Sequence, residues 1–188
     1  MEGGFHFVMD IEIDSIQFKK IMKENGEYLI RLAFYYVKNW STAEDIVQEV
    51  FVTYCQKSDQ FENRSSIRTY LAKITVNKCH DYLRSWKNKI YLYSNLLLGQ
   101  SISNKESPEQ LVINKDKNDM LIKEILEMSI KYREVILLYY YQEFTILEIS
   151  KILNCSENTV KTRLSRAKSI LKSKLEGIEW EVILREQH

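Results

Sequence analysis

Apolar residues recur at steps of three and four along most of the chain, which is the spacing of one face of an α-helix. The first half contains three such faces, formed by Leu29, Ala33, Tyr36, Val37 and Trp40, by Ala43, Ile46, Val47, Val50, Phe51 and Tyr54, and by Ile67, Leu71, Ile74, Cys79, Tyr82 and Leu83. A capping box at residues 41–44 is predicted to begin the second helix. Strand-like alternation does not occur, so we predict an all-α fold.

The helical pattern breaks in the middle of the chain. Residues 99–108 collect turn formers and the only proline, Pro108. We therefore predict two small helical domains, residues 15–90 and 109–176, joined by a flexible linker at residues 91–108, with Pro108 opening the next helix. A single domain is an alternative that the pattern leaves open.

A helix-turn-helix is predicted near the C-terminus. Thr145 and Glu148 form a capping box at the start of a short amphipathic helix, Asn154 suits a left-handed turn, and Ser156 caps a helix over residues 157–174. Val160, Leu164, Ala167 and Leu171 lie on the inner stripe of that helix, opposite Asn158, Lys161, Thr162, Ser165, Arg166 and Ser169. A polar and basic outer face fits the major groove of DNA, whereas the alternative is an ordinary helical hairpin with a solvated face.

Charge is unevenly distributed although the net charge is only +1. Residues 41–62 are mainly acidic, whereas residues 64–89 and 157–174 are mainly basic, which indicates contact with a basic partner and with a polyanion. The helix predicted at about residues 66–86 carries a polar arc of Tyr70, Lys73, Asn77, His80, Asp81 and Arg84. Such side chains suit base edges, phosphates and base stacking, and the polar loop at residues 61–66 suits an everted base. A plain solvated surface is the alternative.

Composition excludes several other classes of protein. The 188 residues are 45% hydrophobic with one proline and five glycines, which is unlike collagen or a disordered chain. Three scattered cysteines and three isolated histidines predict neither a disulfide framework nor a metal site, and no cofactor is expected. The apolar runs are too short for membrane insertion, and residues 1–4 show no secretory signal, so we expect a cytoplasmic protein.

Three segments of the chain carry a family resemblance. They are residues 28–33 with 43–51, residues 66–77, and residues 132–138 with Ile149 and residues 158–167. In this order and spacing they are similar to the signatures of the extracytoplasmic-function (ECF) group of bacterial RNA polymerase sigma factors. The resemblance covers about residues 20–86 and 108–175. Departures from the group are Ser129-Ile130-Lys131, where a leucine-proline pair is usual, and Lys161, where many members have arginine.

The resemblance implies three binding surfaces. Asp45, Gln48 and Glu49 match the face that docks on the clamp coiled coil of core RNA polymerase. Together with the polar arc, it assigns the melted minus-ten strand of promoter DNA to Asn63, Arg64, Ser65, Ser66, Tyr70, Lys73, Asn77, Asp81 and Arg84. Together with the recognition-helix pattern, it assigns the minus-thirty-five element to Asn158, Lys161, Thr162, Ser165, Arg166 and Lys172. An anti-sigma factor is a further partner that the sequence leaves open.

Two other functions compete with this interpretation. A stand-alone helix-turn-helix regulator with an N-terminal dimerisation or ligand domain explains the C-terminal half, but it leaves the acidic and basic helices of the first half without a role. An enzyme has little support, because no nucleophile–base set or phosphate-binding glycine loop occurs. Glu44 and Asp45 lie in a first helical turn, where carboxylates usually serve the helix dipole.

Overall fold

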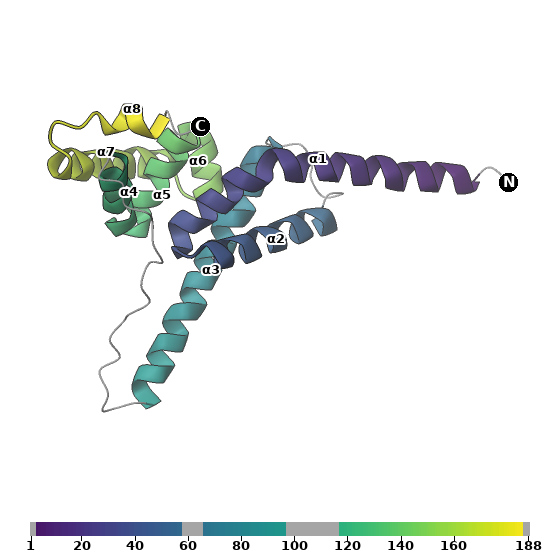
Figure 1. Ribbon diagram of the computed structural model, residues 1–188, viewed down its shortest axis with the longest axis horizontal. Coiled ribbons are helices and arrows are strands. Elements are labelled where there is room, and N and C mark those ends of the chain that lie inside the picture. The colour runs from purple at the N-terminus through teal and green to yellow at the C-terminus, as the bar shows by residue number, and fades with distance from the viewer. Residues whose placement is uncertain (1–2, 58–65, 97–116, 186–188) are drawn as a thin grey trace.

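The computed structural model describes residues 3–57, 66–96 and 117–185, and every regular element in these ranges is helical (Figure 1). The elements are α1 (Gly3–Val37), α2 (Trp40–Lys57), α3 (Ile67–Leu96), α4 (Lys117–Glu127), α5 (Ile130–Ile136), η2 (Leu137–Tyr141), α6 (Ile146–Leu153), α7 (Glu157–Lys174) and α8 (Trp180–Arg185). The predicted all-α fold is confirmed. We call α1–α3 the N-terminal unit and α4–α8, with η2, the C-terminal unit.

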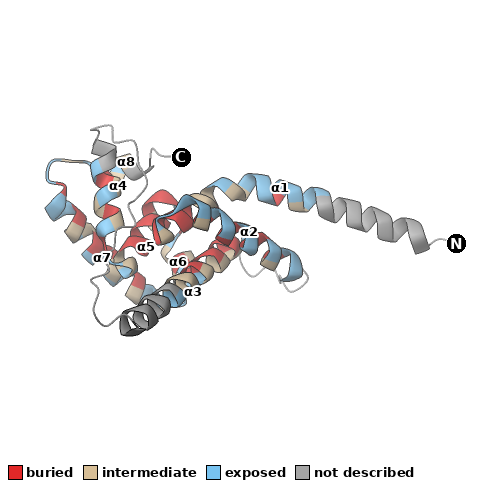
Figure 2. Ribbon diagram, turned by 60° about the horizontal axis from the view of Figure 1, so that its bottom comes forward, coloured by how far each residue is buried: buried red, intermediate tan, exposed pale blue. Residues whose placement is uncertain are grey.

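The N-terminal unit buries the apolar faces that the sequence predicted. Leu29, Ala33, Val50 and Leu71 are fully buried where α1, α2 and α3 pack together, and Figure 2 shows the buried positions along the inner sides of these helices. One predicted member was wrong. Trp40 is about half exposed, because it begins α2 instead of continuing α1.

The start of α2 also differs from the prediction. The amide of Thr42 donates to Asn39 Oδ1 at 2.9 Å, so the cap is an asparagine outside the predicted box at residues 41–44. Lys38, just before it, has a positive φ of 60°, which ends α1 and lets the chain reverse within two residues. The prediction followed the capping-box spacing of Ser41 and Glu44, but asparagine is as favourable a cap as serine, and the position of the chain reversal decides which of them caps the helix.

The helix α3 is longer than predicted. It continues to Leu96, so residues 91–96 of the predicted linker are helical. The physical reason is that no glycine or proline interrupts the helix before Gly99, and loss of amphipathic periodicity alone does not end a helix. In Figure 1 the later part of α3 extends away from the other helices. Pro108 and the remainder of the predicted linker lie outside the described residues.

The helix-turn-helix is confirmed in its caps and its turn. The Thr145 amide donates to Glu148 Oε2 at 2.9 Å, and the Glu148 amide donates to Thr145 Oγ1 at 3.2 Å, which completes the capping box of α6. Asn154 has φ 50° and ψ 48°, the left-handed conformation that the turn requires. Ser156 Oγ then accepts the Thr159 amide at 3.1 Å and caps α7.

A π-helical segment that periodicity did not predict joins α5 to α6. It is η2, in which the Gln142 amide donates to the Leu137 carbonyl at 2.9 Å across five residues. The segment follows α5, which begins at Ile130 after Ser129 in an extended conformation, so the missing leucine-proline pair does not prevent this helix. The buried residues of η2 are Leu137, Leu138, Tyr140 and Tyr141. A π-helical turn is wider than an α-helical turn, so it changes the angular spacing of these side chains around the helix axis.

The C-terminal helix α8 covers part of the C-terminal unit. Its Trp180 is 5% exposed and meets the Tyr140 ring edge-on, with the ring centroids 5.3 Å apart. We expect Trp180→Ala to lower the free energy of unfolding by about 3 kcal/mol, because it removes a large buried ring. Val182→Ala on the exposed side of the same helix is the matched control, with an expected change of about 0.5 kcal/mol or less. Urea unfolding of both variants checks this, and equal midpoints would contradict it.

Candidate nucleic-acid and protein interfaces

The outer face of α7 presents the predicted duplex-binding residues to solvent. Asn158, Lys161, Thr162, Ser165, Arg166 and Lys172 are all exposed. On the opposite side, Val160, Leu164, Ala167 and Leu171 are buried against the rest of the C-terminal unit, as predicted. The capped turn at Ser156 and this buried stripe together fix the rotation of α7, and therefore the direction of its basic face.

Two residues of α5 extend this basic face and were missed by sequence reasoning. The Tyr132 hydroxyl hydrogen-bonds to Arg166, and this bond, with the nearby cation of Lys131, lowers the pKa of Tyr132 below its ordinary value. Lys131 Nζ lies 4.9 Å from the Tyr132 ring centroid. Lys131 and Tyr132 belong to the first turn of α5, so the periodic pattern of α7 gives no sign of them. Only the packing of α5 against α7 brings them next to Arg166.

Lys168 is a further cation of α7 that the sequence did not single out. It pairs with Glu181 of α8 at 3.1 Å and lies 5.7 Å from the Tyr140 ring centroid. Hydrogen bonds to Tyr140 and Glu181 raise the pKa of Lys168. The tail helix therefore holds one lysine at the flank of the predicted DNA-binding face.

The predicted single-strand surface lies on α3. Asn77, Asp81 and Arg84 are exposed, and Arg84 pairs with Asp81 at 2.5 Å. Lys73 and Tyr70 are half-buried, and the Tyr70 ring meets the Tyr54 ring edge-on at 6.3 Å, so Tyr70 lies at the border of the core. The arc is therefore polar, with Tyr70 as its aromatic edge, while its remaining member, His80, contacts Glu134 of α5 at 3.1 Å.

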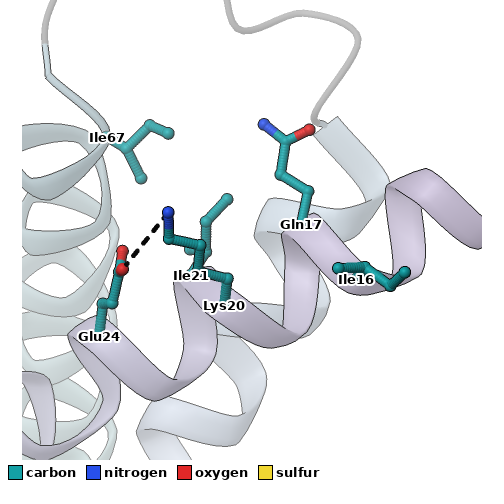
Figure 3. A pocket seen from close by; sticks show the side chains of 6 residues that line it. All are labelled: Ile16, Gln17, Lys20, Ile21, Glu24 and Ile67. Atoms are coloured by element: carbon teal, nitrogen blue, oxygen red, sulfur yellow. Dashed lines mark ion pairs between the residues drawn. The ribbon is translucent and has the colours of Figure 1, made fainter.

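The predicted base-binding loop is described only at its end. Asn63, Arg64 and Ser65 lie outside the described residues. Ser66 is exposed and caps α3, since its Oγ accepts the Thr69 amide at 3.1 Å. Next to it, Ile67 lines an open groove of about 490 Å³ whose other wall is α1 (Figure 3). Lys20 and Glu24 form an ion pair at 3.8 Å along that wall.

The predicted docking face of α2 is exposed along one side of the helix. Asp45, Gln48 and Glu49 are exposed on the side of α2 opposite its buried face, and Val52, on the same side one turn later, is 56% exposed. Glu49 pairs with Lys78 of α3 at 3.0 Å while its own side chain stays largely in solvent. The stripe offers carboxylates, an amide and an apolar side chain to a partner.

Neither a metal centre nor a membrane span is found where the chain is described. Within those ranges, no three histidine, cysteine or acidic side chains gather in a way that would hold a metal ion. Over the same ranges, no helix carries an apolar stretch of the length needed to cross a bilayer.

Known proteins share both the sequence and the fold. Residues 21–89 match the profile of sigma-70 region 2, and residues 118–171 match that of sigma-70 region 4. Among solved structures, the sigma factor RpoE in complex with the anti-sigma factor NepR from Bartonella quintana has the same fold, with a TM-score of 0.68 at 23% identity over 86% of this chain and 98% of that one. CnrH in complex with the cytosolic domain of CnrY gives a TM-score of 0.59 at 19% identity, over 85% and 87% of the two chains.

Curated relatives are similar over most of their length. The ECF RNA polymerase sigma factor SigW of Bacillus subtilis is 29% identical over 172 residues, which is 88% of this chain and 92% of the relative. The RNA polymerase sigma factor SigV of the same organism is 32% identical over 145 residues, 77% and 82% of the two chains. With both regions matched in order and these relatives covered over most of their length, the chain belongs to the ECF sigma factors, which direct promoter recognition and transcription initiation by RNA polymerase.

Proposed function

We propose that this chain recruits core RNA polymerase through the exposed face of α2, binds the minus-thirty-five element with α7, and holds the melted minus-ten strand on α3. The observation that supports the proposal is that none of the assigned side chains that the structure describes is buried. Each of the three faces is therefore available to a macromolecule while the opposite side of its helix builds the core.

The proposed docking chemistry is charge pairing with an apolar centre. Asp45 and Glu49 lie one helical turn apart, a spacing at which two carboxylates receive guanidinium groups from one facing helix. Val52 supplies an apolar side chain in the same stripe. Docking of the partner removes this side chain from water, which favours binding. A basic helix with an apolar residue in its own stripe is the partner that fits.

The proposed upstream contact uses α7 in the major groove. Lys161 and Arg166 supply cations, while Thr162 and Ser165 supply hydroxyl groups suited to phosphates. Arginine presents a planar fork to guanine, whereas Lys161 acts as a point charge, so we assign base reading to Arg166.

This assignment predicts different behaviour for two cations of the same helix. Arg166→Ala is expected to weaken holoenzyme binding to a cognate upstream element by about 1–3 kcal/mol and to relax the preference at one base pair. Lys172→Ala is expected to weaken cognate and mismatched sites alike and to reduce the salt dependence of binding. Equilibrium titration of matched and mismatched promoters at several salt concentrations checks this. If both variants change the two kinds of site equally, the proposed register of α7 is wrong.

The proposal gives the chain no reaction of its own, since RNA synthesis belongs to the polymerase. Because polymerase and chromosome share one compartment, we place the protein in the bacterial cytoplasm.

A stand-alone regulator is the alternative function. Whether the chain needs core polymerase before it binds DNA distinguishes a sigma factor from such a regulator. We expect purified chain to bind promoter DNA tightly only after core polymerase is added, whereas tight binding to duplex DNA by the chain alone would favour the regulator. An anti-sigma partner stays a prediction.

A further inference from the structure

Three cations of α7 form ion pairs with carboxylates of other helices. The pairs are Arg163 with Glu134 of α5, Lys174 with Glu124 of α4, and Lys168 with Glu181 of α8. The first two lie on the side of α7 that packs against α5 and α4. Lys168 differs, because it lies one helical turn from Ser165 and from Lys172, both exposed on the outer face. Of the three, it is therefore the paired cation nearest to the proposed DNA-binding face.

The fold of the tail places Glu181 beside this lysine. Gly177 has a positive φ of 76°, which lets the chain turn after α7 so that α8 returns alongside it (Figure 1). Trp180 is 5% exposed and meets the Tyr140 ring edge-on. Its neighbour Glu181 then lies at the surface, 3.1 Å from Lys168 Nζ. A buried aromatic ring therefore holds the carboxylate in place, whether or not the ion pair is formed.

The pair is exposed enough to exchange its partner. The side chains of Lys168 and Glu181 are 43% and 42% exposed, and an ion pair in contact with water contributes little to stability. The carboxylates that hold the other two cations are more enclosed, since Glu134 is 5% exposed and Glu124 is 22% exposed. Lys168 can therefore leave its carboxylate for another anion without burying an unpaired charge.

The length of α7 indicates which anion Lys168 meets. The helix has 18 residues, or about 27 Å, whereas the major groove of B-form DNA is about 12 Å wide. When its first turns lie among the base edges, its later turns reach the border of the groove, where the phosphates lie. Lys168 and Lys172 belong to the later half of the helix. An ammonium group is a point charge, which suits a phosphate oxygen.

We propose that Lys168 is a phosphate contact of α7, and that Glu181 of α8 competes with the DNA backbone for it. The inference rests on the proposed function, in which α7 enters the major groove of the upstream element. In the free chain the carboxylate neutralises the ammonium. On DNA the ammonium exchanges Glu181 for a phosphate, and Glu181 stays beside the DNA as an unpaired negative charge. The tail helix therefore lowers affinity at every sequence, because phosphates carry no sequence information.

Binding measurements on the complex with core polymerase test the proposal. The probes are a promoter fragment that carries a start site mapped with this complex, and the same fragment with its upstream element scrambled. We expect Glu181→Gln to raise the affinity for both fragments roughly 2- to 5-fold. We expect Lys168→Gln to weaken both and to reduce the slope of log affinity against log salt concentration by about one. An affinity of the Glu181 variant at or below that of the parent chain overturns the proposal, as does an unchanged salt slope for the Lys168 variant.

Two further variants make the test specific to the pair. Glu179→Gln removes an exposed carboxylate of the same tail, and we expect it to leave the affinity unchanged, because salt screens a charge that contacts neither Lys168 nor the DNA. In the Lys168→Gln chain, Glu181→Gln is expected to have no further effect, since the cation for which it competes is gone. Circular dichroism confirms that all variants keep their helices. Equal gains from the two tail variants overturn the proposal, as does a full gain in the Lys168→Gln chain.

The free chain tests the pair without polymerase. Trace amounts of acetic anhydride modify only an unprotonated amine, and hydrogen bonds to Tyr140 and Glu181 raise the pKa of Lys168 and so lower its reactivity. We expect Glu181→Gln, but not Glu179→Gln, to raise the acetylation of Lys168 measured by mass spectrometry. Equal acetylation in the two variants overturns the proposal.

The proposed function and this inference fail in different ways. If the chain forms no complex with core polymerase and promoter DNA, the proposed function is contradicted, and the acetylation of the free chain still decides whether Glu181 holds Lys168. If the complex forms and Glu181→Gln does not raise its affinity for DNA, only the inference is contradicted.

Discussion

Replacing Asp45 and Glu49 by lysine is expected to weaken binding to core polymerase at least 30-fold. Both carboxylates are exposed on the same side of α2, so reversal turns attraction to a basic partner into repulsion. Loss of one partner from a charge pair in an interface typically costs about 2–5 kcal/mol, whereas an exposed change costs the fold about 0.5 kcal/mol or less. Binding is measured by titrating labelled chain with core polymerase, and thermal unfolding checks that the fold is kept.

A charge-matched control separates docking from net charge. Glu176→Lys with Glu179→Lys makes the same change in charge at exposed positions after α7. We expect this control to bind core polymerase within about two-fold of the parent chain, since it lies far from α2 in the sequence and adds only long-range attraction or repulsion. If both double variants weaken binding equally, or if the α2 variant binds undiminished, the docking face is wrongly assigned.

The second large effect is expected on strand opening. Asn77→Ala with Asp81→Ala should leave core binding and recruitment to the upstream element intact, but lower open-complex formation roughly 5- to 150-fold for one lost base contact. The two side chains are exposed one helical turn apart, and they are too short to replace phosphate-binding cations. They therefore suit base edges that become available only when the strands separate.

Permanganate reactivity of promoter thymines measures this opening. A template with a pre-melted bubble should rescue the variant only in part, because capture of the base is still lost. Glu176→Ala with Glu179→Ala removes two exposed carboxylates elsewhere and should open promoters normally. Wild-type reactivity in the Asn77, Asp81 variant would leave α3 a generic basic surface.

Most features encoded by neighbouring residues were predictable from the sequence, the cap of α2 being the exception. The capping box of Thr145 and Glu148, the left-handed Asn154 and the cap at Ser156 depend on residues at most three positions apart, and all three are present. The buried stripe of α7 was predictable for the same reason, because a fixed helical period relates its members. The candidate faces on α2 and α7 follow directly, since exposed residues are those opposite the stripe.

Features that depend on packing between distant segments were not predictable. Glutamate usually lies at the protein surface, yet Glu134 is buried, because Arg163, His80 and Tyr36 contact it from three other helices. Lys168 belongs to a basic helix by sequence, but Glu181 of α8 pairs with it in the fold. In each case the partner lies far along the chain and leaves no periodic signal near the residue.

Transcription from defined start sites tests the central claim most directly. Purified chain is combined with bacterial core polymerase and fragmented chromosomal DNA from the source bacterium, and the 5′ ends of the transcripts are sequenced. We predict transcripts with discrete starts, each preceded by shared sequence near minus ten and minus thirty-five, that disappear when the chain is omitted or carries Asp45→Lys with Glu49→Lys. The same start sites in the absence of the chain, or no transcripts beyond those of core polymerase alone, would contradict it.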